Sequence, residues 1–361
     1  MNPRLIIDLE KLRHNAEFLA DLCDAHGISL TAVTKVFCAD SQMMDVLAPL
    51  KIAYFGDSHL ENIGSYLDGF PQRTMLLRLP THTQARDAVE LADISLNSEL
   101  STIKKLAKAA SEKNKTHGIM IMVDLGDLRE GIYHTNVCGI LEICEYVMGE
   151  ENLTLEGIGT NLTCYGSVVP SEQNMGRLAE IASIIEEKFG LSLNVVSGGN
   201  SSALNMLASG KMPAKINNLR LGESIVCGLE TANGKPFQGL VQDVVVLEAT
   251  IVEIAKKPSM PEGDTNINAF GEKVTYVDRG EHLRAILAVG RQDTAADGLT
   301  CLTPEVEIIG ASSDHLIVDI THAPPLIVGD TLRFSLSYGA VLAGFTSGYV
   351  DRHYVNHPDE G

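Results

Sequence analysis

The stretch LTAVTKVF at residues 30–37 joins a short apolar, β-branched run to a single lysine. Such a run is typical of a buried strand, and we therefore predict a strand over residues 30–35 with Lys35 at its carboxyl end. Val36 and Phe37 follow, so the amine has largely apolar neighbours in the sequence. A lysine in this setting either extends its amine into solvent or has a lowered pKa, which makes the amine a nucleophile for a carbonyl group.

The same pattern of a short apolar run followed by an amphipathic helix repeats on both sides of this stretch. The other predicted strands are residues 52–56, 75–79, 94–97, 118–124, 155–161, 193–197 and 218–222. Strands that alternate with helices in this way predict a closed parallel (β/α)8 barrel. A doubly wound open sheet is the alternative, but it usually has a glycine-rich turn after its first strand, and residues 35–38 (KVFC) are not such a turn.

The pattern changes after about residue 228. Six β-rich runs follow without predicted helices between them, and Gly and Pro residues separate them, at 241–253, 273–278, 284–289, 306–309, 316–320 and 332–336. This composition predicts a second, all-β domain. We therefore assign residues 10–228 to the barrel and residues 229–361 to a C-terminal β domain, to which residues 1–9 contribute a strand.

Composition limits the class of function. The net charge of −19 argues against nucleic acid or an anionic membrane surface as a partner, and no apolar run reaches the roughly 18 residues of a transmembrane helix. The N-terminus leads directly into a strand pattern rather than a signal peptide. The seven scattered cysteines contain no Cys-x-x-Cys pair, which indicates a reduced, cytoplasmic protein without a disulfide framework or zinc site.

In a barrel of this kind the chemistry lies at the carboxyl ends of the strands. The stretch SGGNSS at residues 197–202 follows the seventh predicted strand and precedes a predicted helix. Small residues allow backbone amides to approach an anion, and a helix N-terminus adds a positive partial charge. These features favour a phosphate-binding loop, whereas the alternative is an ordinary glycine-containing loop that ends in a Ser or Asn helix cap.

Two arginines lie at other strand ends. Arg220 would point into the mouth of the barrel as a permanently charged fork of donors, or would pair with Glu223. Arg129, in VDLGDLREG at residues 123–131, would clamp a carboxylate or phosphate, or would pair with Asp124 or Asp127.

The sixth predicted strand ends in NLTCYG at residues 161–166. This stretch offers an amide, a hydroxyl, a thiol and a phenol. The thiol of Cys164 is either inert or reactive, and its environment would decide which.

Together these stretches resemble the fold-type III pyridoxal-phosphate enzymes of the alanine racemase superfamily, and most closely its ornithine racemases and predicted amino-acid racemases. The resemblance covers nearly the whole chain. It includes the stretches quoted above, residues 7–15, GASSDH at residues 310–315 and GFTS at residues 344–347. It implies a pyridoxal 5'-phosphate cofactor and a racemase that acts on ornithine or another basic amino acid.

The resemblance also implies roles for individual residues. Lys35 would bind the cofactor covalently and act as the base on one face of the substrate Cα. Arg220 would face the pyridine nitrogen and keep it unprotonated, and Arg129 would lie near the phenolic oxygen or the substrate carboxylate. Asn161 would also bind the cofactor, at a position where alanine racemase has a histidine. The phosphate would be held by Gly198, Gly199, Ser201 and Tyr338. The remaining implied cofactor-binding residues are Ser197 and Asn200. The β domain of one subunit would cover the barrel mouth of another, which gives a head-to-tail homodimer.

One departure from the family pattern concerns the second acid–base group. Alanine racemase supplies it as a tyrosine in a Gly-Tyr-x-Asp-Gly stretch, whereas residues 290–294 read GRQDT here. Racemisation by two bases needs a proton donor on each face of Cα. The candidates for the opposite face are therefore Asp314, His315, Cys164 and Asp293.

Two other functions stay open at this point. D-threonine aldolase or D-serine dehydratase chemistry on the same fold would need a divalent metal on a His-x-Cys or His-x-Asp pair, and His357-Pro358-Asp359 has that spacing. A non-catalytic cofactor-carrying or regulatory protein of this fold would lack the β domain that we predict here. We therefore expect a racemase without a metal site.

Overall fold

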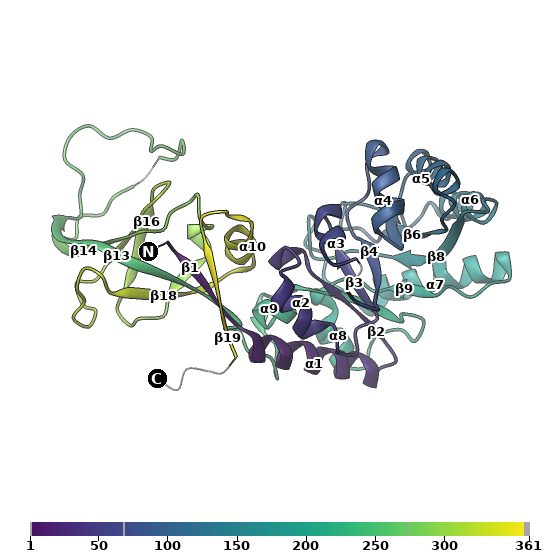
Figure 1. The fold of residues 1–361 in the computed structure, drawn as a ribbon, viewed down its shortest axis with the longest axis horizontal. Helices are drawn as coiled ribbons and strands as arrows, with labels where there is room; N and C mark the ends of the chain where they lie inside the picture. The colour runs from purple at the N-terminus through teal and green to yellow at the C-terminus, as the bar shows by residue number, and fades with distance from the viewer. Residues whose placement is uncertain (1, 68, 274, 357–361) are drawn as a thin grey trace. The chain divides into compact units, whose positions relative to one another are not determined.

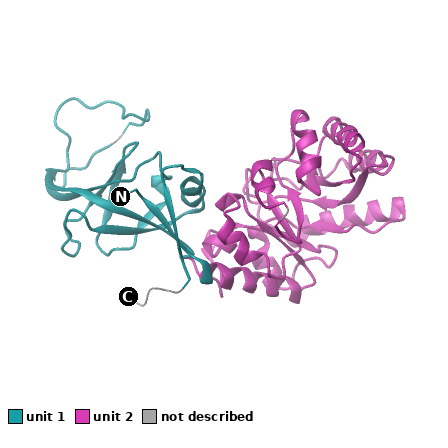
Figure 2. Cartoon of the chain, in the orientation of Figure 1, with its two compact units in different colours: residues 1–10, 243–361 teal, residues 11–242 magenta. Residues whose placement is uncertain are grey.

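The computed structural model describes residues 2–67, 69–273 and 275–356. The chain divides into two compact units, which are residues 1–10 with 243–361 (unit 1) and residues 11–242 (unit 2), as Figure 2 shows. The segment that follows residue 228 still belongs to unit 2. It forms the short hairpin of β11 (Leu229–Glu230) and β12 (Lys235–Pro236), and Asn15 accepts the N–H of Val241 at 2.9 Å.

Unit 2 is a closed parallel barrel with helices around it (Figure 1). The barrel strands are β2 (Ser29–Val33), β3 (Tyr54–Asp57), β4 (Arg73–Leu76), β5 (Ile94–Asn97), β6 (His117–Asp124), β8 (Leu153–Gly159), β9 (Val195–Ser197) and β10 (Asn218–Leu221). β10 pairs with β2 and β5 pairs with β6, so the sheet closes on itself. The predicted (β/α)8 barrel is therefore confirmed, and each of the eight predicted strands overlaps an observed one.

A helix follows each of these strands, and one further helix precedes β2. They are α1 (Leu9–Ala25), α2 (Ser41–Leu47), α3 (Leu60–Tyr66), α4 (Ala85–Leu91), α5 (Leu100–Lys113), α6 (Val137–Met148), α7 (Glu172–Phe189), α8 (Leu204–Ala208) and α9 (Glu223–Cys227). The ends of α7 illustrate the local signals: Ser171 accepts the N–H of Asn174 at its start, and Gly190 at its end has a φ of 64°. A side-chain cap and a left-handed glycine are the usual terminators of a helix. No helix among the described residues is both long and apolar enough to cross a membrane.

Short elements complete unit 2. They are β7 (Ile132–Tyr133) and the 3₁₀ helices η1 (Lys35–Phe37), η2 (His82–Gln84) and η3 (Ser201–Ala203). The chain thus turns tightly at the carboxyl ends of β2 and β9, where η1 and η3 begin.

Unit 1 is built on a mainly antiparallel sheet, so the predicted β domain is confirmed, although it also contains a helix. Its strands are β1 (Arg4–Asp8), β13 (Val245–Pro258), β14 (Glu281–Leu287), β15 (Leu299–Cys301), β16 (Glu307–Ala311), β17 (Leu316–Asp319), β18 (Thr331–Leu336) and β19 (Asp351–Val355). The N-terminal strand β1 pairs with β13 and with β19. The short 3₁₀ helix η4 (Ala296–Gly298) and the helix α10 (Tyr338–Thr346), which the sequence pattern did not predict, also belong to this unit. The predicted run 273–278 forms a single bridge, from Lys273 to Ile267, among the described residues.

Closure of the barrel requires one very close approach between strands. Gly157 of β8 pairs with Val195 of β9, and a Cβ at position 157 would lie 1.7 Å from the Val195 carbonyl oxygen. Because backbone atoms on both sides are fixed by the sheet, a larger residue would force the two strands apart.

We expect Gly157→Ala to lower the free energy of unfolding by about 1–3 kcal/mol or more, as overpacked core sites do. Urea unfolding followed by circular dichroism would measure it. Gly176→Ala is the matched control, because a Cβ at this position of α7 would have no atom within 4 Å and alanine is the better helix former. Equal unfolding midpoints for the two variants would contradict this account of barrel closure.

Candidate active site

Lys35 lies just beyond the carboxyl end of β2, in a tight turn rather than on the strand. The strand ends at Val33, and Lys35 is the first residue of η1, so its predicted place at the tip of a strand is corrected. Thr34 directs the turn: its N–H donates to the Gly56 carbonyl at 2.9 Å, and its hydroxyl donates to Asp57 Oδ2 at 2.6 Å. The end of β3 thereby fixes the backbone that carries the lysine.

The amine of Lys35 is held in an environment that favours its neutral form. Burial lowers its pKa, and the charge of Arg129 lowers it further, whereas Cys164, Asp57 and Glu130 act in the opposite direction. A lowered pKa increases the fraction of free amine at neutral pH, and the free amine is the form that attacks a carbonyl group. Lys35 is therefore a largely buried amine with a lowered pKa rather than an ordinary surface lysine.

Arg220 is buried, with an exposed fraction of 3%. Its guanidinium donates to the Thr160 carbonyl at 2.6 Å, to Asn161 Oδ1 at 2.7 Å and to the hydroxyl of Ser197. Burial lowers the pKa of Arg220 to about 10, with Glu130 opposing this effect, so the side chain is still charged at neutral pH. The alternative partner Glu223 is not among its hydrogen-bond or ion-pair partners in the described structure.

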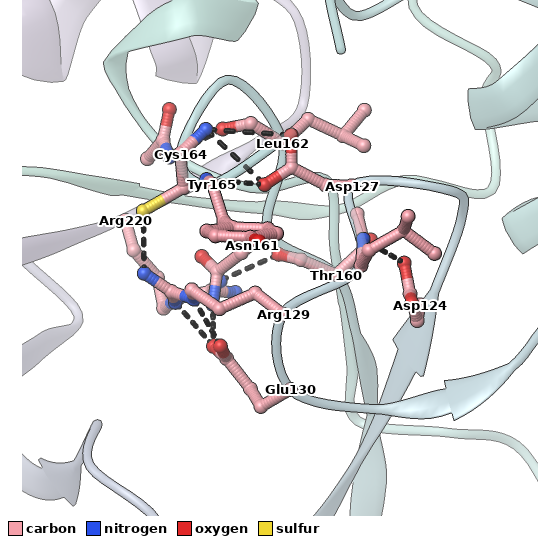
Figure 3. A network of polar contacts seen from close by, with 12 residues as sticks. Asp124, Asp127, Arg129, Glu130, Thr160, Asn161, Leu162, Cys164, Tyr165 and Arg220 are labelled. Carbon is pink, nitrogen blue, oxygen red and sulfur yellow. Dashed lines mark hydrogen bonds and ion pairs between the residues drawn. The ribbon is translucent and has the colours of Figure 1, made fainter. Parts of the chain in front are cut away.

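Arg129 pairs with Glu130, and not with Asp124 or Asp127 (Figure 3). Both Nε and an Nη atom of the guanidinium donate to the Glu130 carboxylate, and the other Nη atom lies 2.7 Å from the sulfur of Cys164. Burial raises the pKa of Glu130, but the bonds from Arg129 outweigh burial and hold that pKa below its usual range. Arg129 is thus a fixed cation beside Cys164.

Glu130 also connects the two arginines. Asn161 donates from Nδ2 to Glu130 and accepts from Arg220 at Oδ1, so the side chains of Arg129, Glu130, Asn161 and Arg220 form one continuous chain (Figure 3). The sequence analysis did not identify Glu130. Its only local signal is its place beside Arg129, and adjacent residues carry no general expectation of pairing.

The carboxylates of Asp127 and Asp124 accept hydrogen bonds from backbone N–H groups. Asp127, which is 1% exposed, accepts the N–H groups of Cys164, Tyr165 and Val168 at 2.9–3.4 Å. Asp124 accepts two N–H groups of its own loop. A buried carboxylate that receives several N–H bonds is well stabilised. These two residues therefore shape the loops that present Arg129 and Cys164.

The loop at residues 197–202 joins β9 to η3. Gly199 has a φ of 105°, and a Cβ there would have no neighbour closer than 3.7 Å. Ser201 is bonded to the hydroxyl of Ser224 at 3.0 Å, and Asn200 Oδ1 accepts the N–H of Ser202 at 2.9 Å. The predicted helix over 202–209 is shorter than expected, since α8 begins only at Leu204.

This loop has the donors that a phosphate group needs. The hydroxyl oxygen of Ser202 and that of Thr160 are buried and have no hydrogen-bond partner among the described residues. Hydroxyls and backbone amides of small residues are the groups that bind phosphate in such loops. The loop with Ser202, together with Thr160 after β8, therefore fits a phosphorylated cofactor.

The remaining predicted residues lie in unit 1. Tyr338 is the first residue of α10. Asp314 and His315 are exposed in the turn between β16 and β17, with His315 Nδ1 3.4 Å from Asp314 Oδ1. Hydrogen bonding by Ser312 is the main cause that lowers the pKa of Asp314. Asp293 is buried and accepts the N–H of Gly290 at 2.8 Å, and burial raises its pKa.

A metal site was not expected. No group of three or more His, Cys, Asp or Glu side chains among residues 2–67, 69–273 and 275–356 is arranged to hold a metal ion. The pair in His357-Pro358-Asp359 lies outside the described residues.

Comparison with known proteins identifies relatives over nearly the whole chain. The family model of the alanine racemase N-terminal domain matches residues 7–229. The chain is 44% identical over 356 residues to the ornithine racemase of Acetoanaerobium sticklandii, covering 98% of this chain and 100% of the relative. It is 35% identical over 353 residues to the lysine racemase of Thermotoga maritima, covering 98% of each.

Among solved structures, alanine racemase from Streptomyces coelicolor A3(2) superposes with a TM-score of 0.75 at 18% identity, covering 99% of this chain and 98% of the other. This likeness extends to both units and shows a shared fold. Together with the family match and the two full-length relatives, it leads to one conclusion: the chain belongs to the alanine racemase family and is a racemase.

Proposed function

We propose that this racemase interconverts L- and D-ornithine and that its cofactor is pyridoxal 5'-phosphate bound to Lys35. One observation carries the proposal. Lys35, Arg220 and the loop at 197–202 lie at the carboxyl ends of β2, β10 and β9, which are neighbouring strands. A reactive amine, a buried cation and a phosphate-binding loop are thereby gathered at one edge of the barrel mouth, where barrel enzymes have their active sites.

In this proposal the chain's own residues hold the cofactor. Pyridoxal phosphate, when bound, withdraws electrons from the substrate Cα and so makes its proton removable. Lys35 would hold it covalently, Arg220 would face the ring nitrogen, and Arg129 would face the phenolic oxygen or the substrate carboxylate. The other cofactor contacts in this proposal are Asn161, Ser197, Gly198, Gly199, Asn200, Ser201 and, from unit 1, Tyr338.

Proton transfer needs one group on each face of Cα. Lys35 would serve one face, because its lowered pKa makes the free amine available as a base. For the opposite face unit 2 offers Cys164, whose sulfur is held by Arg129, and unit 1 offers Asp314 and His315. Asp293 is the weakest candidate, because it is buried and already accepts a backbone N–H.

Ornithine is favoured as the substrate by the 44% identity to an ornithine racemase. Lysine is the second candidate, since the relative at 35% identity is a lysine racemase. Both substrates carry a distal ammonium group, and the net charge of −19 favours the approach of a cation.

The proposal extends to assembly and location. The family resemblance favours a head-to-tail homodimer as the active form. The seven cysteines are all free, which supports a cytoplasmic location.

Lys35 provides the first test. The purified protein is expected to be yellow with pyridoxal phosphate, and borohydride reduction followed by peptide mass mapping should locate the cofactor on Lys35. Lys35→Ala should reduce racemisation at least about 10²-fold, since both the attachment point and one base are lost. Lys51→Ala is the control, because the side chain of Lys51 is exposed and its Nζ lies 3.3 Å from Asp24 Oδ2. A wild-type protein that takes up no pyridoxal phosphate would overturn the proposed cofactor.

Substrate choice is tested by exchange. The enzyme is incubated in deuterated water with ornithine, lysine or alanine, and chiral chromatography with mass spectrometry measures inversion and deuterium at Cα. We expect the highest kcat/KM for ornithine, and full activity in the presence of EDTA. A higher kcat/KM for lysine or alanine would refute the substrate assignment and leave the racemase assignment intact.

Single substitutions test the opposite-face group. Cys164→Ser, Asp314→Asn and His315→Gln are compared for deuterium exchange from each enantiomer of ornithine. Loss of the opposite-face group should slow exchange from one enantiomer about 10²-fold or more, and exchange from the other should persist through Lys35. If all three variants exchange both enantiomers at wild-type rates, none of these residues is the second acid–base group.

A further inference from the structure

Glu130 belongs to the polar network shown in Figure 3, where it connects Arg129 and Asn161. Its side chain is 12% exposed. It accepts two bonds from the Arg129 guanidinium and one from the amide of Asn161. A carboxylate with three charge-assisted or amide donors is strongly fixed in position, so Glu130 is a rigid anchor rather than a surface charge.

This anchor determines which way the Asn161 amide points. An ionised carboxylate can only accept hydrogen bonds, so the Nδ2 group of Asn161 must face Glu130. The Oδ1 atom of Asn161 is then left to accept from Arg220, at 2.7 Å. Glu130 therefore orients Arg220 through Asn161, although the two charged groups do not touch.

The negative charge of Glu130 also acts on the three cations of the site. Its charge raises the pKa of Lys35, Arg129 and Arg220. The charged groups that shift the pKa of Lys35 are Arg129, Cys164, Asp57 and Glu130. The charge of Lys35 in turn opposes the rise that burial causes in the pKa of Glu223. Among these, Glu130 is the carboxylate that acts on all three cations of the described site.

We propose that Glu130 is a positioning residue of the cofactor site, which holds Arg129 directly, orients Arg220 through Asn161, and offsets the positive charge around Lys35. The inference rests on the proposed function, because it assigns Glu130 its task in binding pyridoxal phosphate. Glu130 does not need to touch the cofactor in this role.

The barrel contains a closely matched control. Glu156 of β8 accepts from Arg73 at 2.5 Å and from Asn194 at 3.0 Å, and its exposed fraction is 4%. It is therefore also a buried carboxylate between an arginine and an asparagine. Arg73 begins β4 and Asn194 precedes β9, so this cluster lies toward the amino ends of strands and away from the proposed site.

The test compares Glu130→Gln with Glu156→Gln. Spectroscopic titration of the apoenzymes with pyridoxal phosphate, repeated across pH, gives a dissociation constant and a pH midpoint for attachment. Glu130→Gln should raise the dissociation constant about tenfold or more, as expected for a lost bond to a charged group. It should also move the pH midpoint downward, because removal of the negative charge lowers the pKa of Lys35. Glu156→Gln should change neither value, although it lowers thermal stability.

Glu130→Asp is the second variant. It retains the charge, so the pH midpoint should return toward that of the wild type, but its shorter side chain should leave the affinity several-fold below wild type. If Glu130→Gln does not fold, Glu130→Asp is compared with Glu156→Asp in the same titration. If a Glu130 variant and the matching Glu156 variant bind pyridoxal phosphate with equal affinity, and the wild type also binds it, the role proposed for Glu130 is wrong. A wild type that binds none would instead overturn the proposed function.

Discussion

The burial of one guanidinium organises the carboxyl end of this barrel. Arg220 is almost fully removed from water, and a buried cation is stable only where acceptors surround it. Thr160 and Asn161 after β8 and Ser197 at the end of β9 supply those acceptors. Ser197 in turn donates to Asn218 at 2.7 Å, and Asn218 donates to a hydroxyl of β2. Arg220 thereby links β10 to the carboxyl ends of β8 and β9.

The proposed site has two electrostatic requirements, which Arg129 and Glu130 affect in opposite directions. A phosphorylated cofactor and a substrate carboxylate both require cations, but a reactive Lys35 requires a lowered pKa. In the proposed function Arg129 would meet both requirements, because it is a cation and it also lowers the pKa of Lys35. Glu130 limits that effect and holds Arg129 in place. The carboxylates of Asp124 and Asp127 accept backbone N–H groups instead of pairing with the arginines.

Much of the fold follows from local pattern, whereas the pairing of charges does not. Eight apolar runs separated by amphipathic helices predicted the parallel barrel, and the polar residues at their ends predicted the site. The local ion pairs considered as the alternative for the two arginines are not the ones observed: Arg129 binds Glu130 rather than Asp124 or Asp127, and Arg220 binds polar oxygens rather than Glu223. Asp124 and Asp127 accept backbone N–H groups of the folded loops, and the long-range contacts of Asp127 are not visible in the local sequence pattern.

The sequence by itself determined the alternation of strands and helices, the position of Lys35 after the first barrel strand and that of the glycine-containing loop after the seventh, because each depends on neighbours along the chain. The tertiary structure alone decided that Lys35 sits in a 3₁₀ turn held by Asp57 and that Glu130 connects the two arginines. These contacts join the ends of different strands, whose spacing is set only when the sheet closes. For that reason the chemistry of the site could be listed from the sequence, but the residue that holds it in place could not.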